Sequence, residues 1–253
     1  MHSEIAVRLK LRYPPVAILF TDEKPAGATE FIEGRRGCVV TLLTAAMKGR
    51  QAVLSRRNFG CPGGAAGLGF GNLYPHFPGG FEYFLSVGKG EGYPEGEAYK
   101  KTPDLVESFL KVMPFTDIPY EYVVFKPLSG LEAEKEEPKI IVFYANPDQL
   151  SALVVLANYG RTGNDNVVIP FAAGCQACCL LPLNESSKEQ PKAVVGMIDI
   201  SARPFIDADL LSFSLPFSMF REMEANVAGS FLDKHSWKKI ADRIMNMAIR
   251  TII

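Results

Sequence analysis

Two stretches of the chain share one order of predicted elements, and this order limits the folds that the sequence can adopt. In each, an apolar run of strand length follows a proline: Val16–Phe20 comes after Pro15, and Ile140–Tyr144 comes after Pro138. Uninterrupted apolar runs of this length are typical of strands buried on both faces of a sheet. A loop, a helix opened by Gly-Cys and a further apolar strand follow in both stretches. The sequence therefore predicts an α/β fold, a mixed sheet flanked by helices.

The repeated order also predicts an internal duplication. A single domain would contain two related halves, about residues 1–126 and 139–253, packed around a pseudo-two-fold axis. The charged segment Lys126–Lys139 is predicted to be a solvated connector between them. The 253 residues of the chain are enough for one large domain of this kind.

The remaining elements are predicted from periodicity, caps and turn residues. Helices are expected at Ser3–Leu11, Cys38–Lys48, Thr102–Val112, Asp148–Asn158 and Asp207–Phe217, and over most of the chain from there to Arg250. Further strands are expected at Gln51–Ser55, Glu82–Val87, Tyr120–Phe125, Val167–Ile169 and Ala193–Ile200.

Three of the five cysteines follow a glycine at the start of a predicted helix or of a glycine-rich segment. They are Cys38, Cys61 and Cys175. A helix N-terminus carries partial positive charge and free N–H groups, which lower the pKa of a thiol placed there. We therefore expect these three thiols to gather at one site and to bind metal or react.

The first hypothesis for that site is an iron–sulfur cluster or another metal in redox chemistry. The ligands would be Cys38, Cys61 and Cys175, with the fourth position taken by Cys178 or left open to substrate or water. Arginines and backbone N–H groups stabilise an anionic cluster. The residues expected to form that pocket are Arg35, Arg57, Gly60, Gly63 and Gly64. The cysteine spacing does not match a ferredoxin run.

Two other hypotheses stay open. A non-catalytic module could bind a small ligand in the cleft between the halves, with cysteines that only pack. The aromatic residues of 74–84 and 213–220 are numerous enough to line a flat apolar pocket, but most of them are expected to belong to the core. A thiol–disulfide enzyme could instead use Cys175 and Cys178, which have C-x-x-C spacing. Cys179 is expected to be a core residue in each case. Whether the protein is an enzyme is left open.

Two further polar residues have two interpretations each. Asp199 follows an apolar strand and precedes Arg203, so it is either half of a buried ion pair or a functional carboxylate. His76 lies among aromatic residues and is either a metal ligand or an ordinary loop residue.

Charge and composition narrow the range of partners. The formal net charge is −1, so no basic field is available to attract nucleic acid. No apolar run reaches the length that crosses a bilayer, and the first ten residues carry charges where a secretory signal has an apolar region. We expect a cytoplasmic protein with reduced cysteines that binds a small molecule or cluster. The apolar C-terminal helix could supply a homodimer surface.

The pattern resembles one known family. Pro15 before the strand Val16–Phe20, Cys38, the run Gly60-Cys61-x-Gly-Gly, and Gly174-Cys175 in the second half are similar to the DUF169 family of uncharacterised proteins from archaea and anaerobic bacteria. The resemblance covers nearly the whole chain. It implies a cytoplasmic, oxygen-poor setting in which iron–sulfur chemistry is plausible, and it assigns no reaction. Cys178 and Cys179 are not part of the pattern.

Overall fold

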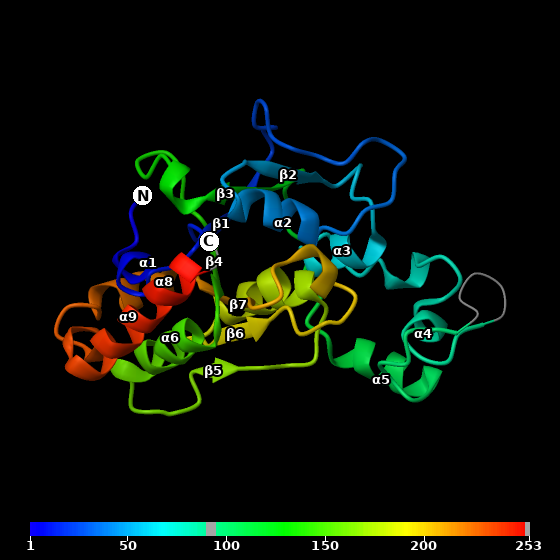
Figure 1. Cartoon of the computed structure of the whole chain (residues 1–253). Coiled ribbons are helices and arrows are strands. Elements are labelled where there is room, and N and C mark those ends of the chain that lie inside the picture. The colour runs from blue at the N-terminus through cyan, green and yellow to red at the C-terminus, as the bar shows by residue number, and fades with distance from the viewer. Residues whose placement is uncertain (90–94, 251–253) are drawn as a thin grey trace.

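A seven-stranded sheet forms the centre of the computed structural model, which describes residues 1–89 and 95–250 (Figure 1). Its strands are β1 (Val16–Thr21), β2 (Ala52–Ser55), β3 (Tyr122–Pro127), β4 (Ile140–Ala145), β5 (Val167–Val168), β6 (Ala193–Gly196) and β7 (Leu211–Pro216). The strand order is β2-β3-β1-β4-β7-β6-β5. All neighbouring strands are antiparallel except β5 and β6, which are parallel. The predicted α/β class with a mixed sheet is confirmed.

The helices fall into two groups by position in the chain. Those before β4 are α1 (Glu4–Arg8), α2 (Val40–Met47), α3 (Pro62–Gly67), η1 (Tyr74–His76), α4 (Phe81–Phe84), α5 (Pro103–Val112) and η2 (Leu128–Gly130). Those after β4 are α6 (Pro147–Tyr159), the π-helical turn η3 (Gln176–Leu180), α7 (Leu181–Glu185), η4 (Arg203–Phe205), α8 (Phe217–Ala225), η5 (Phe231–Asp233) and α9 (His235–Arg250).

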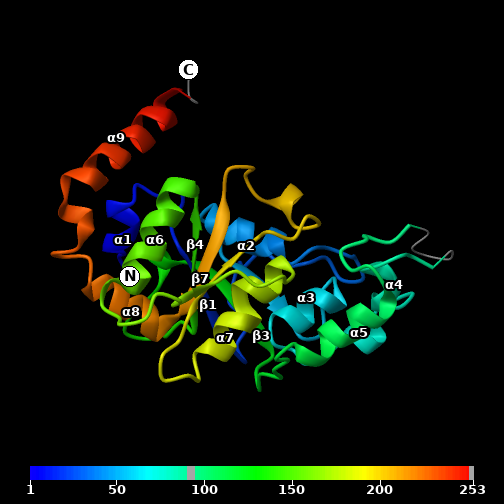
Figure 2. The same cartoon turned by 90° about the horizontal axis from the view of Figure 1, so that it is seen from below.

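Both faces of the sheet are buried, which explains why its central strands are uniformly apolar. In β1, Val16 and Ile18 face one core while Ala17 and Leu19 face the other. Helices α2 and α3 and the turn η3 cover the first face. Helices α1, α6, α8 and α9 cover the second, as Figures 1 and 2 show.

The strand order is the same on either side of the central β1–β4 pair. From that pair outward it runs β1-β3-β2 in the first half and β4-β7-β6 in the second, with β5 added at one edge. The helix that precedes β2 and the helical segment that precedes β6 both follow a Gly-Cys turn. The internal duplication stays a prediction, because strand order alone does not establish a common origin of the halves.

Two predicted elements are wrong. The segment predicted as the strand Glu82–Val87 contains helix α4, whose Phe81 packs into a small aromatic core of its own. The segment predicted as the helix Asp207–Phe217 contains strand β7. Its alternating sequence Leu-Ser-Phe-Ser-Leu has the period of two that a strand requires, and it pairs with β4 and β6 on its two sides.

Helices α4 and α5 lie side by side at one end of the molecule, away from α1, α6, α8 and α9 (Figures 1 and 2). Their core includes Phe81, Leu85 and Val106, and Ala66 of α3 joins it to the main body. The chain leaves the sheet after β2, builds this aromatic lobe, and returns in β3. The lobe thus stands beside α3 and forms one wall of the site described below.

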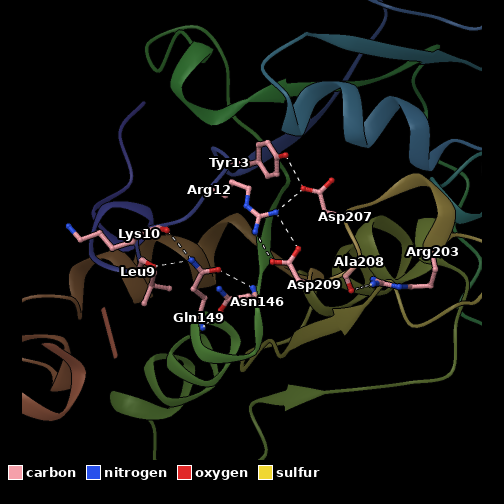
Figure 3. Close-up of polar contacts among 10 residues, drawn as sticks. All are labelled: Leu9, Lys10, Arg12, Tyr13, Asn146, Gln149, Arg203, Asp207, Ala208 and Asp209. Carbon is pink, nitrogen blue, oxygen red and sulfur yellow. Dashed lines mark hydrogen bonds and ion pairs between the residues drawn. The ribbon is translucent and has the colours of Figure 1, made fainter. Parts of the chain in front are cut away.

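The N-terminal segment is held by residues of the second half (Figure 3). The Gln149 side-chain amide donates to the carbonyls of Leu9 and Lys10 at 3.2 and 2.9 Å. Arg12 forms ion pairs with Asp207 and Asp209.

At the start of α1, the Glu224 carboxylate accepts hydrogen bonds from the Ser3 hydroxyl (2.5 Å) and the Glu4 N–H (2.9 Å). The Trp237 ring N–H donates to the carbonyl of Arg8 at 3.2 Å.

Within the residues that the structure describes, no helix is both long and apolar enough to span a membrane.

Candidate functional site

A cavity of about 460 Å³ lies where the two halves of the chain meet the aromatic lobe. The first half contributes residues 36–39 and 60–64, six residues of the segment 74–85, and Tyr99 and Phe109; the six are Tyr74, Phe77, Pro78, Phe81, Phe84 and Leu85. The second half contributes residues 171–173, Cys175, Gln176, Asp199 and Ser201. Most of these side chains are aromatic or aliphatic, so the cavity is largely apolar.

Cys38, Cys61 and Cys175 all line this one cavity. All five cysteines of the chain are free thiols, and Cys175 is buried while Cys38 and Cys61 are partly buried. The structure therefore brings together the three cysteines that follow a glycine.

Close packing explains the glycines before Cys38 and Cys61. The Gly37 N–H donates to the Gly60 carbonyl at 3.3 Å, so the two turns are joined. The Phe31 ring lies against both glycines, and a Cβ atom at Gly37 or Gly60 would come within 2.6 or 2.9 Å of it. Gly60 also has a φ of +66°, a conformation that favours glycine. A larger residue at either position would push the two cysteine-bearing turns apart.

Cys61 and Cys175 meet at the start of α3. The Cys61 sulfur caps this helix by accepting a hydrogen bond from the Gly64 N–H at 3.4 Å. The Cys175 thiol donates to the Gly63 carbonyl at 3.6 Å. Glycines 63 and 64 thus line the cavity through their backbone and hold both sulfurs in place.

Burial raises the pKa of the Cys38 thiol to about 11, and the nearby Cys61 adds to this. Burial also raises the pKa of Cys175 well above its usual value, with further contributions from Cys61 and Cys38. The expected lowering by a helix N-terminus is wrong for these two residues. Helix α2 begins only at Val40, and loss of water around the sulfur outweighs the helix dipole. Cys38 and Cys175 are therefore neutral thiols near pH 7.

Cys178 and Cys179 do not line the cavity. Both are fully buried in the core between η3 and the sheet. The hydroxyls of Tyr144, Ser212 and Ser214 lie around the Cys178 sulfur, and none of the three has another hydrogen-bond partner. Burial raises the pKa of Cys178 to about 11.

Among the arginines whose side chains the structure describes, only Arg36 lines the cavity. Arg35 is exposed and not among the lining residues, and Arg57 extends into solvent, where it pairs with Glu121 at 3.5 Å. Gly60, Gly63 and Gly64 do line it.

Several lining residues were not predicted from the sequence. Tyr99, Phe109 and Phe171 come from three separate segments and carry no local signal. Gln176 is a polar residue in an otherwise apolar run, and this pattern is a sequence signal from which it could have been predicted as a site residue. Its side-chain amide donates to the Tyr74 hydroxyl at 2.8 Å, and its carbonyl oxygen accepts from the Ala173 N–H at 2.9 Å.

The predicted aromatic pocket is found only in part. The lining includes Tyr74, Phe77, Phe81 and Phe84. By contrast, Phe213, Phe217 and Phe220 belong to the core on the other face of the sheet. His76 does not line the cavity.

Over residues 1–89 and 95–250, no group of three or more histidine, cysteine or acidic side chains has the geometry to hold a metal ion.

The match to a family model covers residues 4–226, so the chain belongs to the DUF169 family, described as "Uncharacterised ArCR". No curated protein and no solved structure matches the chain. The predicted cytoplasmic location, homodimer and lack of nucleic-acid binding stay predictions.

Proposed function

We propose that the protein binds a small, flat and largely apolar molecule in the cysteine-lined cavity. The observation that carries this proposal is the aromatic lining of a cavity of about 460 Å³, a volume typical of small-molecule sites. The Phe77 and Phe81 rings lie 5.2 Å apart, and those of Phe109 and Phe171 lie 5.5 Å apart. Rings at these distances present apolar walls against which a planar molecule can stack.

The fluorescent dye N-phenyl-1-naphthylamine tests this proposal, because it is neutral, flat and brightens in apolar surroundings. We expect saturable binding with a blue-shifted emission. Phe109→Ala should weaken the binding because it removes a wall of the cavity. Leu105→Ala is the matched control, since Leu105 is exposed on the same helix and does not line the cavity. No saturable binding, or equal effects of the two substitutions, would contradict the proposal.

A second candidate is an iron–sulfur cluster held by Cys38, Cys61 and Cys175. It is favoured by the convergence of these thiols from three separate segments on one cavity. A cluster spreads its ligand sulfurs about 6–7 Å apart, farther than one ion allows. A bound cluster would supply one-electron transfer. The protein's own residues would orient a substrate and exclude water from it.

Anaerobic reconstitution with iron and sulfide tests this candidate through the visible spectrum and the metal content. Cys61→Ser should abolish the chromophore, whereas Cys178→Ser should leave it intact because Cys178 lies outside the cavity. A protein that stays colourless and free of iron would rule the cluster out. The thiol–disulfide alternative gains no support, since Cys175 and Cys178 are both buried and have raised pKa values.

A further inference from the structure

Asp199 places a carboxylate in the lining of the largely apolar cavity, and no cation in the described part of the chain pairs with it. A carboxylate in apolar surroundings costs free energy unless a positive group or hydrogen-bond donors compensate it. The donors that Asp199 does have come from Ser201 and Gly174.

These contacts fix the carboxylate and leave one oxygen nearly free. The Oδ1 atom accepts two hydrogen bonds from Ser201, one from its N–H at 3.0 Å and one from its hydroxyl at 2.8 Å. The Oδ2 atom accepts only a long one from the Gly174 N–H, at 3.4 Å. The turn that carries Asp199 begins at Met197, a buried residue with a φ of +59°. Non-glycine residues adopt this conformation rarely, and chiefly where the surrounding structure requires it.

The cation nearest to Asp199 in the sequence is engaged elsewhere. The Arg203 guanidinium donates to three backbone carbonyls, those of Met197 (3.4 Å), Ala208 (2.6 Å) and Leu210 (2.5 Å). Figure 3 shows the contact with Ala208. Arg203 therefore stabilises the loop that follows β6 and does not neutralise Asp199, which decides against the buried ion pair considered from the sequence.

The negative charge of Asp199 affects the pKa values of four titratable groups around the cavity. It contributes to the raised pKa values of Cys38, Cys175, Tyr74 and Tyr99. These groups come from four different segments of both halves, so the carboxylate lies near the point where the segments converge.

We propose that the ligand of this cavity is an amine that carries an aromatic ring and is cationic near pH 7, whose ammonium group donates to Asp199 while its ring stacks on the aromatic wall. The inference rests on the proposed function and adds the chemical class of the ligand. Aromatic faces attract cations, and a hydrogen bond between two charged groups is stronger than one between neutral groups.

Arg36 offers the opposite charge at the same cavity. Its side chain is exposed, and no hydrogen bond or ion pair in the described structure anchors it. An anionic ligand would have to order this side chain on binding, whereas Asp199 is already held in place. The geometry thus favours the amine over the anion, and the experiment separates the two.

Three naphthalene probes of similar shape and different charge test the inference. At pH 7, 2-naphthylmethylamine is a cation, 2-naphthalenemethanol is neutral and 2-naphthoate is an anion. Each is used to displace N-phenyl-1-naphthylamine from the protein. We expect the amine to bind at least about tenfold more tightly than the alcohol, and the naphthoate to bind most weakly. Asp199→Asn should bring the affinity for the amine down to that for the alcohol and leave the alcohol unchanged.

Asp209→Asn is the control variant, because Asp209 pairs with Arg12 on the surface and does not line the cavity. Thermal unfolding shows whether each variant is folded. An amine that binds no better than the alcohol, or that is insensitive to Asp199→Asn in a folded protein, refutes the inference and leaves the proposed function intact. Tightest binding of the naphthoate also refutes it, in favour of Arg36. If the dye itself does not bind, the proposed function fails as well.

Discussion

Replacing Gly67 by alanine tests how closely α3 packs against η3. Gly67 is the last residue of α3, and a Cβ atom there would lie 2.5 Å from the Cys175 sulfur. It would also lie 3.1 Å from the Cys175 Cβ and from the backbone nitrogen of Gln176. Rotation about the side-chain bond of Cys175 can move its sulfur, but it cannot move the Cys175 Cβ or the Gln176 nitrogen. The helix and the π-helical turn would therefore have to separate, and Cys175 would shift from its place in the cavity wall.

The size of the effect follows from two opposing terms. Overpacking of a buried contact costs about 1–3 kcal/mol. Alanine in place of a helical glycine returns up to about 1 kcal/mol through helix propensity. We therefore expect Gly67→Ala to lower the free energy of unfolding by about 1–2 kcal/mol. For a chain of this length, that lowers the melting temperature by roughly 2–8 °C.

Gly63→Ala is the matched control in the same helix. Its Cβ would meet Tyr74 at 3.4 Å, an ordinary contact distance, so we expect unchanged or slightly increased stability. Urea unfolding followed by circular dichroism measures both variants. The double variant Gly67→Ala/Cys175→Ala removes the shortest contact and should lose less stability than the sum of the two single variants. The reasoning would be refuted if Gly67→Ala and Gly63→Ala were equally stable. It would also be refuted if the stability losses of Gly67→Ala and Cys175→Ala simply added in the double variant.

Three further predictions concern the thiols and the N-terminal segment. The pKa of the Cys178 thiol is about 11 in the folded protein, against 9.0 for the ordinary group. The neutral Cys178 thiol therefore stabilises the folded protein fully below pH 9, and this contribution, up to roughly 3 kcal/mol, is lost by pH 11. In a plot of the urea midpoint of unfolding against pH, Cys178→Ala should flatten the part between these two values. Iodoacetamide at pH 8 should modify Cys178 and Cys179 only after unfolding, so their labelling in the native protein, detected by mass spectrometry, would contradict the described core. Gln149→Ala should cost about 2–3 kcal/mol, because it removes a capping box and leaves the carbonyls of Leu9 and Lys10 without their donor. Ser151→Ala on the same helix, where the side chain is exposed, should cost less than about 0.5 kcal/mol, and comparable losses in the two variants would argue against this contact.

The parts of the fold that could be predicted are those with a local signal. The apolar runs at β1 and β4 and the caps at Ser3 and Thr102 gave elements of the right type. Strand β7 was missed because a short alternating segment beside a longer helical one, α8, has an ambiguous period. Helix α4 was missed because its four residues are stabilised by aromatic packing with distant residues.

In the candidate site too, the predictable features are those with a local sequence signal. Glycine before cysteine is visible in the sequence, and Cys38, Cys61 and Cys175 do share one cavity. The rest of the lining depends on which distant segments fold together, and no spacing encodes this for Phe109, Phe171 or Asp199. The raised thiol pKa values also follow from burial, which a sequence does not quantify.

The contacts of α1 have a consequence for how the protein is made. Ser3 and Glu4 bind Glu224, and the carbonyl of Arg8 binds Trp237, so the first helix depends on residues that are synthesised 220 or more positions later. Strand β1 similarly pairs with β3 and β4, which leave the ribosome about a hundred residues after it. The nascent chain therefore exposes the apolar strand β1 until much of the domain has been translated. We therefore expect the folding of this protein to be completed late, largely after translation, and its early intermediates to be prone to aggregation.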